Sequence, residues 1–133
     1  MALDSSLIGA SSDPVVFEVE KGAIVSLAEA IGDPRPEYRE GVAAPPTFPT
    51  TFRMPVPGLA DVDPARFLHG EQEYEYDRPL RAGDRITCVA RIANVTEKDT
   101  RVGRATFVVA EIDGRDEAGE PVFTGRATLL VRA

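Results

Sequence analysis

The second half of the chain places the tightest constraint on the fold. Four β-like segments follow one another, at residues 68–77, 84–95, 101–113 and 120–132. Short turn signals separate them, such as Ala82-Gly83-Asp84 between the first two. Consecutive strands joined by short turns pair as an antiparallel meander. In residues 106–112 one face is apolar and the other mixed, so one face of the sheet needs a cover.

The first half supplies the material for that cover. Residues 15–19 alternate weakly and predict a short strand, and residues 21–31 show helical spacing that Gly32 would end as a C-cap. The run 45–52 resembles the opening of a second helix, because proline is tolerated in a first turn. We therefore expect an α+β fold, with a curved antiparallel sheet wrapped around a central helix.

Two further expectations follow from the same reading. Residues 55–66 are rich in proline and turn formers, so they predict an irregular surface excursion. A curved sheet around one helix leaves strand edges open, and an open edge usually finds a partner. We therefore expect a dimer.

Length and charge narrow the class of protein. A chain of 133 residues is expected to form one domain, residues 1–133. A net charge of −7 gives no electrostatic footprint for nucleic acid or an anionic membrane, so neither is expected as a partner. No apolar run reaches the roughly 18 residues of a membrane span, and residues 1–12 do not resemble a secretory signal. The expected location is the cytoplasm.

Few side chains suggest chemistry on their own. Cys88 is the only cysteine and is predicted to be buried in a strand. His69, the only histidine, has no Cys or His companion at ligand spacing, so no metal site is expected. The alternating Glu71, Glu73 and Glu75 predict a solvated stripe. Arg78, Arg81 and Arg85 form either a local anion site or a solvated strand edge.

Several blocks resemble the MaoC-like dehydratases of the hot-dog fold. They resemble in particular the N-terminal-type dehydratase domain of actinobacterial (3R)-hydroxyacyl-ACP dehydratase subunits. The blocks are Gly32-Asp33-Pro34-Arg35-Pro36-Glu37-Tyr38, Val42-Ala43-Ala44-Pro45-Pro46-Thr47-Phe48, Leu68-His69-Gly70-Glu71-Gln72-Glu73-Tyr74 and Arg78-Pro79-Leu80-Arg81-Ala82-Gly83-Asp84. The resemblance covers nearly the whole chain.

The resemblance implies a catalytic signature that this chain lacks in part. In the family, Asp-x-Asn-Pro-x-His supplies an aspartate and a histidine that activate the water added to an enoyl thioester. Asp33 matches the aspartate, whereas Tyr38 stands at the histidine position and Arg35 at the asparagine position. With an ordinary pKa of about 10, a tyrosine is a poor base at neutral pH. Pro45-Pro46 replaces a common His-Gly pair, which leaves the amide of Thr47 to bind the thioester carbonyl.

The candidate site residues follow from this comparison. Asp33 and Tyr38 are the candidate catalytic residues, although Asp33 also suits a turn before proline. Pro46, Thr47, Phe48 and His69 are the candidate substrate-binding residues. His69 and Glu71 could instead be structural or interface residues. Phe48, Phe52 and Phe67 could line an acyl pocket or pack the core.

Three functions remain open. The resemblance implies a subunit that binds an acyl-CoA or acyl-ACP thioester and works with a catalytic partner, as a homodimer or a heterodimer and without a cofactor. Alternatively, the chain is an autonomous hydratase or dehydratase that uses Asp33 with Tyr38 or His69. The third possibility is a hot-dog module that binds without turnover.

Overall fold

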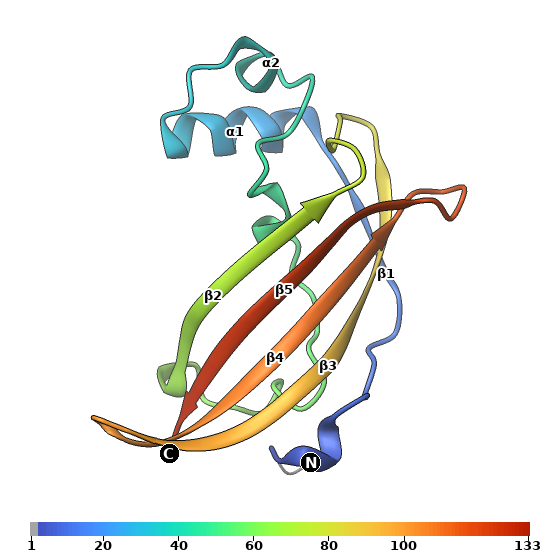
Figure 1. Cartoon of the computed structure of the whole chain (residues 1–133). Coiled ribbons are helices and arrows are strands. Elements are labelled where there is room, and N and C mark those ends of the chain that lie inside the picture. The colour runs from blue at the N-terminus through green and yellow to red at the C-terminus, as the bar shows by residue number, and fades with distance from the viewer. Residues whose placement is uncertain (1–2) are drawn as a thin grey trace.

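The computed structural model describes residues 3–133, which form one five-stranded antiparallel sheet and short helices (Figure 1). The strands are β1 Val15–Glu18, β2 Phe67–Tyr76, β3 Arg85–Thr100, β4 Gly103–Arg115 and β5 Pro121–Arg132. Their order in the sheet is β1-β3-β4-β5-β2. The four strands predicted for the second half are confirmed, and β3 continues to Thr100 to form a long hairpin with β4.

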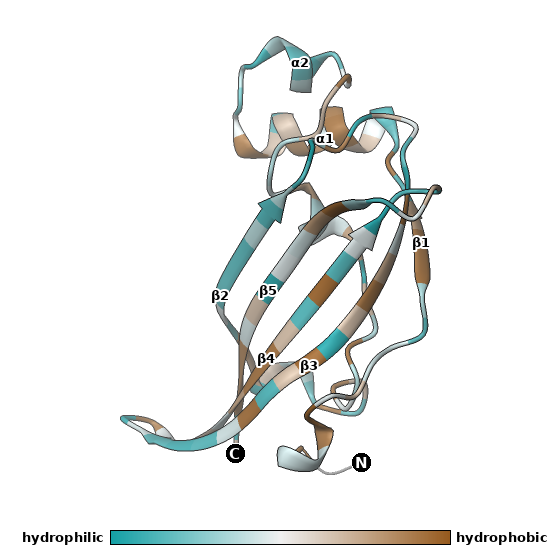
Figure 2. Ribbon diagram, turned by 45° about the vertical axis from the view of Figure 1, so that its right-hand side comes forward, coloured by the Kyte–Doolittle hydropathy of each residue, from teal (hydrophilic) through white to brown (hydrophobic). Residues whose placement is uncertain are grey.

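The two faces of the sheet differ in burial, as the alternation in β4 predicts. On β3, Ile86, Cys88, Ala90 and Ile92 point to the inner face and are fully buried. Residues between them face outward and are more exposed, and Figure 2 shows the alternating hydropathy along the central strands. Cys88 is therefore a buried core residue, as predicted, and burial raises the pKa of its thiol to about 12.

The first predicted helix is confirmed as α1, Lys21–Ile31. Gly32 ends it in the left-handed conformation and donates its N–H to the carbonyls of Ala28 and Glu29, which is the C-cap expected of glycine. A second short helix, α2 Pro36–Arg39, follows at once. Figure 1 shows α1 and α2 together at one end of the sheet, which we call the upper end.

The helix predicted to open at residues 45–52 is wrong in its extent. Only one 3-10 turn forms, Phe48–Thr51, and the chain is then irregular up to a second turn at Pro64–Arg66. Pro49 has no N–H to donate, and Pro55 and Pro57 follow closely, so a ladder of i to i−4 hydrogen bonds cannot grow. The inner face is thus covered mostly by irregular chain.

That irregular chain is more than a surface excursion. Leu59 is buried, and Val56 and Val62 pack around it against the inner face of the sheet. Leu7, from a 3-10 turn at Ser5–Leu7, is 1 % exposed and packs in the same cluster. The cover was predicted from the sheet's apolar face, and it forms without a long helix.

The core has two parts along the inner face. The upper cluster consists of Val19, Ile24, Ala44, Phe48, Leu80, Ile86, Cys88, Val122 and Phe123. The lower cluster consists of Leu7, Leu59, Ile92, Val95, Val108, Ala110 and Val131. Phe52 links the cover to the upper cluster, because its ring stacks on Phe17 at 4.6 Å between centroids.

The two edges of the sheet are treated differently. The outer edge of β3 pairs with β1 and, further along, with Gly9 to Ser12, whose backbone exchanges hydrogen bonds with Ala90 and Ile92. The outer edge of β2 pairs with no other strand within residues 3–133. The sheet therefore presents β2 as its long open edge.

Candidate functional site

The segment with the incomplete family signature lies at the upper end, between α1 and α2. Asp33 Oδ1 accepts the backbone N–H of Arg35 at 3.0 Å, and Arg39 Nε donates to the Asp33 carbonyl oxygen at 2.7 Å. The first of these bonds is that of an Asx turn leading into α2, and the second ties the Arg39 side chain back to the same turn. The structure therefore supports the turn reading of Asp33 that the Gly-Asp-Pro sequence suggested.

Arg35 stands between the two candidate catalytic residues. Its Nε lies 3.9 Å from Asp33 Oδ1, and its Nη1 donates to the Tyr38 hydroxyl oxygen at 3.4 Å. The hydrogen bond with Tyr38 and the charge of Asp33 both raise the pKa of Arg35. Asp33 and Tyr38 are thus brought together, but around a guanidinium and without an imidazole.

Tyr38 lines a hollow at the upper end. The side chain is 8 % exposed and faces a volume of about 510 Å³, which we call the upper hollow. The other residues of this wall are Glu37, Ala43, Ala44, Pro46, Tyr76, Asp77, Arg78 and Pro79. Burial raises the pKa of Tyr76, so its phenol stays protonated and donates to the Pro46 carbonyl.

The turn after Pro46 leads from this hollow to a second one. Phe48 N–H donates to the Pro45 carbonyl at 2.9 Å, and Thr50 N–H donates to the Thr47 carbonyl at 3.0 Å. Pro45 and Pro46 have no N–H, and within residues 3–133 the Thr47 N–H has no protein acceptor. Thr47 as a whole residue is exposed.

Phe48 does not line either hollow. It is 2 % exposed and packs edge-on against Phe52 at 5.8 Å between centroids. Of the three phenylalanines considered above, Phe48 is core, whereas Phe52 and Phe67 line apolar hollows on the inner face. Phe48 is therefore part of the upper core and not of a cavity wall.

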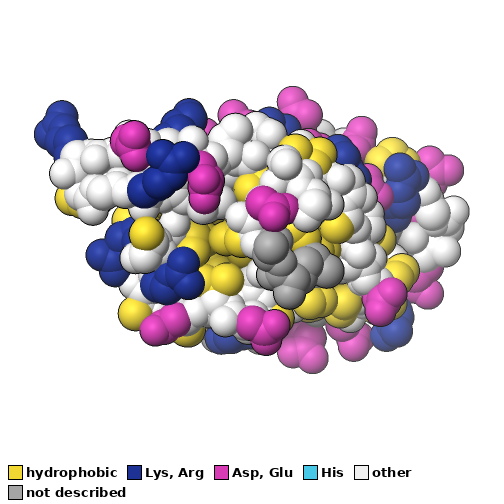
Figure 3. Space-filling view, turned by 90° about the horizontal axis from the view of Figure 1, so that it is seen from below, with side chains coloured by type: hydrophobic (Ala, Val, Ile, Leu, Met, Phe, Trp, Pro, Cys, Tyr) yellow, Lys and Arg dark blue, Asp and Glu magenta, His cyan; other side chains and the backbone are white. Residues whose placement is uncertain are grey.

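Two adjoining hollows of about 460 Å³ and 410 Å³ lie between the cover and the inner face of β2, β5 and β4. They share Met54, Val56, His69 and Leu129, so we treat them as one inner groove. Small residues form part of its floor, among them Ala110, Gly125 and Ala127. Figure 3 shows hydrophobic side chains framed by charged ones at the lower end. The groove is predominantly apolar.

His69 enters this groove because of a β-bulge. The pairing of β2 with β5 shifts register between His69 and Glu71, so Gly70 is the extra residue. His69 and Gln72, three residues apart, consequently face the same side, and His69 Nε2 lies 3.1 Å from Gln72 Oε1. Gln72 was not predicted as a site residue.

Tyr38 and His69 lie far apart within one chain. Tyr38 shares the upper hollow with Tyr76, whereas His69 is seven residues earlier on β2, which corresponds to about 20 Å of strand. The structure therefore separates Asp33 and Tyr38 from His69 within the chain.

Two arginines of the predicted Arg78, Arg81 and Arg85 cluster have carboxylate partners. Arg78 donates to Asp84 at 2.8 Å, and Arg85 lies 3.9 Å from Glu18, which favours the strand-edge reading of these two arginines. No group of three or more His, Cys, Asp or Glu side chains in residues 3–133 could hold a metal ion. In the same residues no helix is long and apolar enough to cross a membrane.

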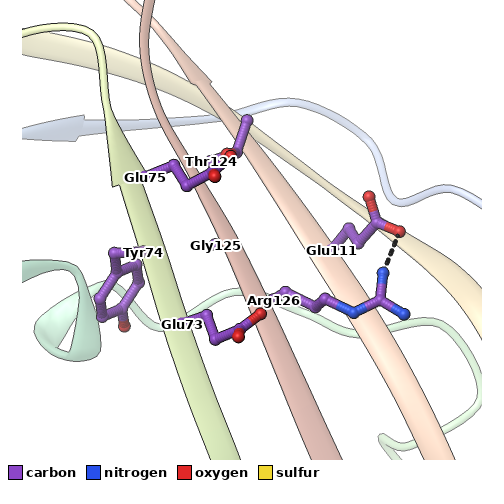
Figure 4. A pocket seen from close by; sticks show the side chains of 7 residues that line it. All are labelled: Glu73, Tyr74, Glu75, Glu111, Thr124, Gly125 and Arg126. Atoms are coloured by element: carbon purple, nitrogen blue, oxygen red, sulfur yellow. Dashed lines mark hydrogen bonds and ion pairs between the residues drawn. The ribbon is translucent and has the colours of Figure 1, made fainter.

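A further depression lies on the outer face and is lined by charged side chains (Figure 4). Glu73 and Glu75 lie on the same side of the sheet as Thr124 and Arg126, while Tyr74 points away from them. Arg126 Nη1 donates to Glu111 Oε1 at 2.9 Å. The glutamates of β2 are exposed, as predicted for a solvated stripe.

Comparisons with known proteins agree with this architecture. The profile of the FAS1-like dehydratase domain region matches residues 6–125. A UPF0336 protein from Streptomyces avermitilis is 37 % identical over 150 aligned residues, covering 100 % of this chain and 97 % of that protein. A UPF0336 protein from Streptomyces coelicolor is 36 % identical over 152, again covering 100 % of this chain and 97 % of that protein.

Solved structures show the same fold at lower identity. The HadBC (3R)-hydroxyacyl-ACP dehydratase complex of Mycobacterium tuberculosis gives a TM-score of 0.74 at 24 % identity, covering 93 % of this chain and 96 % of that chain. The ChsH1–ChsH2 complex of the same organism gives 0.73 at 23 %, covering 92 % and 84 %. A MaoC-like dehydratase gives 0.81 at 22 %, covering 99 % and 44 %. The chain thus belongs to the FAS1-like dehydratase domain region family and has the α+β hot-dog fold of the MaoC-like dehydratases.

Proposed function

We propose that this chain is a cytoplasmic, acyl-thioester-binding subunit of a MaoC-like (R)-specific enoyl hydratase or 3-hydroxyacyl dehydratase, and that it works with a catalytic partner. The observation that carries the proposal is the unit formed by Asp33, Arg35 and Tyr38. A phenol occupies the place of the imidazole and accepts a hydrogen bond from a guanidinium. The Asp33 carboxylate is engaged by its own turn. These contacts support a subunit that does not by itself take a proton from water at neutral pH.

The open edge of β2 supports a partner of the same fold. If a second MaoC-like chain pairs antiparallel with β2, opposite ends of the two strands meet. The inner groove of one protomer then lies beside the upper hollow of the other, so one continuous cleft would include residues of both. The HadBC and ChsH1–ChsH2 structures are complexes of two different proteins, which agrees with a heterodimer, and a homodimer would use the same edge.

In this arrangement the chain would supply part of the wall of the acyl-binding tunnel. The inner groove, lined by Met54, Val56 and Leu129, would hold the acyl chain of an acyl-CoA or acyl-ACP by apolar burial. Thr47 would donate its free amide to the thioester carbonyl, where negative charge develops during the reaction. The partner would supply the water-activating aspartate and histidine.

Hydration of crotonyl-CoA, followed by loss of the enoyl absorbance, tests the proposal. The purified chain alone is expected to give no turnover, and addition of a sibling with the complete Asp-x-Asn-Pro-x-His signature is expected to give activity. That activity should survive Tyr38→Phe and disappear when the sibling's signature histidine becomes alanine. Turnover by the chain alone, abolished by Tyr38→Phe or His69→Ala, would identify an autonomous enzyme instead.

A restoring variant sharpens the test. Arg35→Asn combined with Tyr38→His rebuilds the family signature on this backbone. If the missing imidazole is what prevents catalysis, the double variant should gain hydratase activity that requires Asp33, with Asp33→Asn as the matched control. A complex that binds acyl-CoA but stays inactive with every sibling would favour the binding module.

A further inference from the structure

One wall of the inner groove carries hydrogen-bonding groups in a row. His69, Gln72 and Tyr74 all project from β2 into it. The extra residue at the Gly70 bulge shifts the alternation by one position, so that Gln72 and Tyr74 face the inner side as His69 does. Both Tyr74 and Gln72 lie over Gly125 of β5, since a Cβ there would be 3.1 Å from the Tyr74 ring and 3.6 Å from Gln72 Nε2. The row is therefore continuous.

The facing wall and floor are apolar. Phe52, Met54 and Val56 come from the cover, and Ile112 and Leu129 come from β4 and β5. Thr50 also lines the groove, but its hydroxyl already donates to the Thr47 carbonyl at 2.8 Å. The groove is thus polar along β2 and apolar elsewhere.

The polar groups of this wall have unused hydrogen-bonding capacity. Gln72 Nε2 donates two long hydrogen bonds, to the carbonyls of Glu73 and Arg126, both at 3.4 Å. Gln72 Oε1 lies 3.1 Å from His69 Nε2 and keeps a second lone pair for a ligand hydroxyl. Among residues 3–133 the Tyr74 hydroxyl has no hydrogen-bond partner. Burial raises the pKa of Tyr74 to about 12, so this hydroxyl keeps its proton and can donate.

We propose that the inner groove selects acyl groups that carry a hydroxyl or keto oxygen in addition to the reacting thioester end, and that Gln72 and Tyr74 bind this oxygen. The inference rests on the proposed function, because it specifies the acyl group that the groove holds. A plain hydrocarbon chain would remove water from these groups without replacing its hydrogen bonds. Leaving such a group unpaired in a desolvated site is unfavourable, whereas an oxygen on the acyl chain restores the pairing.

Binding of matched acyl-CoAs to the full chain tests this by isothermal titration calorimetry. The probes are dodecanoyl-CoA and monohydroxydodecanoyl-CoAs with the hydroxyl at mid-chain or near the methyl end. At least one hydroxylated probe is expected to bind about tenfold more tightly than dodecanoyl-CoA. Gln72→Met and Tyr74→Phe keep the side-chain volume and remove the polar atoms, so each should reduce severalfold the ratio between the affinities for the hydroxylated probe and for dodecanoyl-CoA.

Glu73→Gln is the matched control, because Glu73 lies between the two positions and faces outward. It should leave the preference unchanged. Equal affinities for all probes, or a preference that survives both substitutions, would overturn this inference while leaving acyl binding intact. Failure of every acyl-CoA to bind would instead overturn the proposed function, and this inference with it.

Discussion

A glycine opposite a phenylalanine decides how the upper core packs. Gly114 on β4 is the cross-strand partner of Phe123 on β5. A Cβ at Gly114 would overlap the Phe123 ring, with Cδ1 at 2.7 Å and Cζ at 3.0 Å. Phe123 is 1 % exposed, so its ring has no solvent to move into. Gly114→Ala should therefore destabilise the fold.

The expected size follows from two opposing contributions. Overpacking a filled core costs about 1–3 kcal/mol. Replacing glycine by alanine also lowers the entropy of the unfolded chain, which returns about 0.4–1 kcal/mol. The ring cannot tilt freely, because Tyr76 and Phe52 hold it at centroid distances of 5.9 Å and 6.2 Å. We expect a net loss of about 1–2 kcal/mol.

A double-mutant cycle with Phe123→Leu isolates the cause. Leucine removes the ring atoms that the new methyl group would meet, so Gly114→Ala should become neutral or slightly stabilising in that background. The coupling energy should be about 1–2 kcal/mol, measured by urea unfolding followed by circular dichroism. Gly22→Ala in α1 is the matched control, since nothing lies within 4 Å of its Cβ, and it should stabilise the fold slightly.

The result that would refute this reasoning is additivity. If Gly114→Ala costs the same in both backgrounds, to within about 0.5 kcal/mol, the ring is not the source of the strain. A stabilising Gly114→Ala in the natural background would show that the sheet relaxes around the methyl group.

Two further predictions concern the lower and the upper cluster. Leu7→Ala should lower the free energy of unfolding by about 2–5 kcal/mol. It should also speed amide hydrogen exchange in residues 56–62, because Leu7 packs on Gly58 and Leu59. Faster exchange limited to the first ten residues would contradict this prediction. Cys88 should resist a thiol reagent at pH 8 until the protein unfolds, and a thiol that reacts at the rate of free cysteine would refute its burial. The free energy of unfolding should fall as the pH rises from about 9 to 12. The reason is that burial raises the pKa of Cys88 and of Tyr74 to about 12, so the unfolded chain releases protons that the folded chain retains.

Local patterns were sufficient for most of the fold. The strand run in the second half, α1 and its end at Gly32 were predictable because alternation, helical spacing and glycine caps are encoded by neighbouring residues. The helix predicted to open at residues 45–52 does not form, and the reason is again local: Pro49, Pro55 and Pro57 outweigh a favourable start at Pro45. The irregular chain in its place still covers the inner face of the sheet, because that apolar face must be buried whatever the conformation of the covering segment.

The candidate site could be predicted only in part from the sequence. The resemblance to the family signature singled out Asp33, Arg35 and Tyr38 as candidates, and the structure brings these three together. The assignment of Phe48 to the core and the pairing of Arg78 with Asp84 depend on contacts between distant segments. Gln72 was missed because only the bulge at Gly70 turns it to the side of His69.

By itself, the sequence determined that the signature position of an imidazole is filled by Tyr38, and that an antiparallel sheet with one apolar face must form. The first conclusion rests on the resemblance of residues 33–38 to the family signature, and the second on the alternation of apolar and polar residues along the strands. Only the tertiary structure decided that an apolar groove with one polar wall opens beneath a mostly irregular cover. The physical reason is that strand register and bulges set which side chains face one another across space, and a shift of one residue would turn that wall to the opposite face.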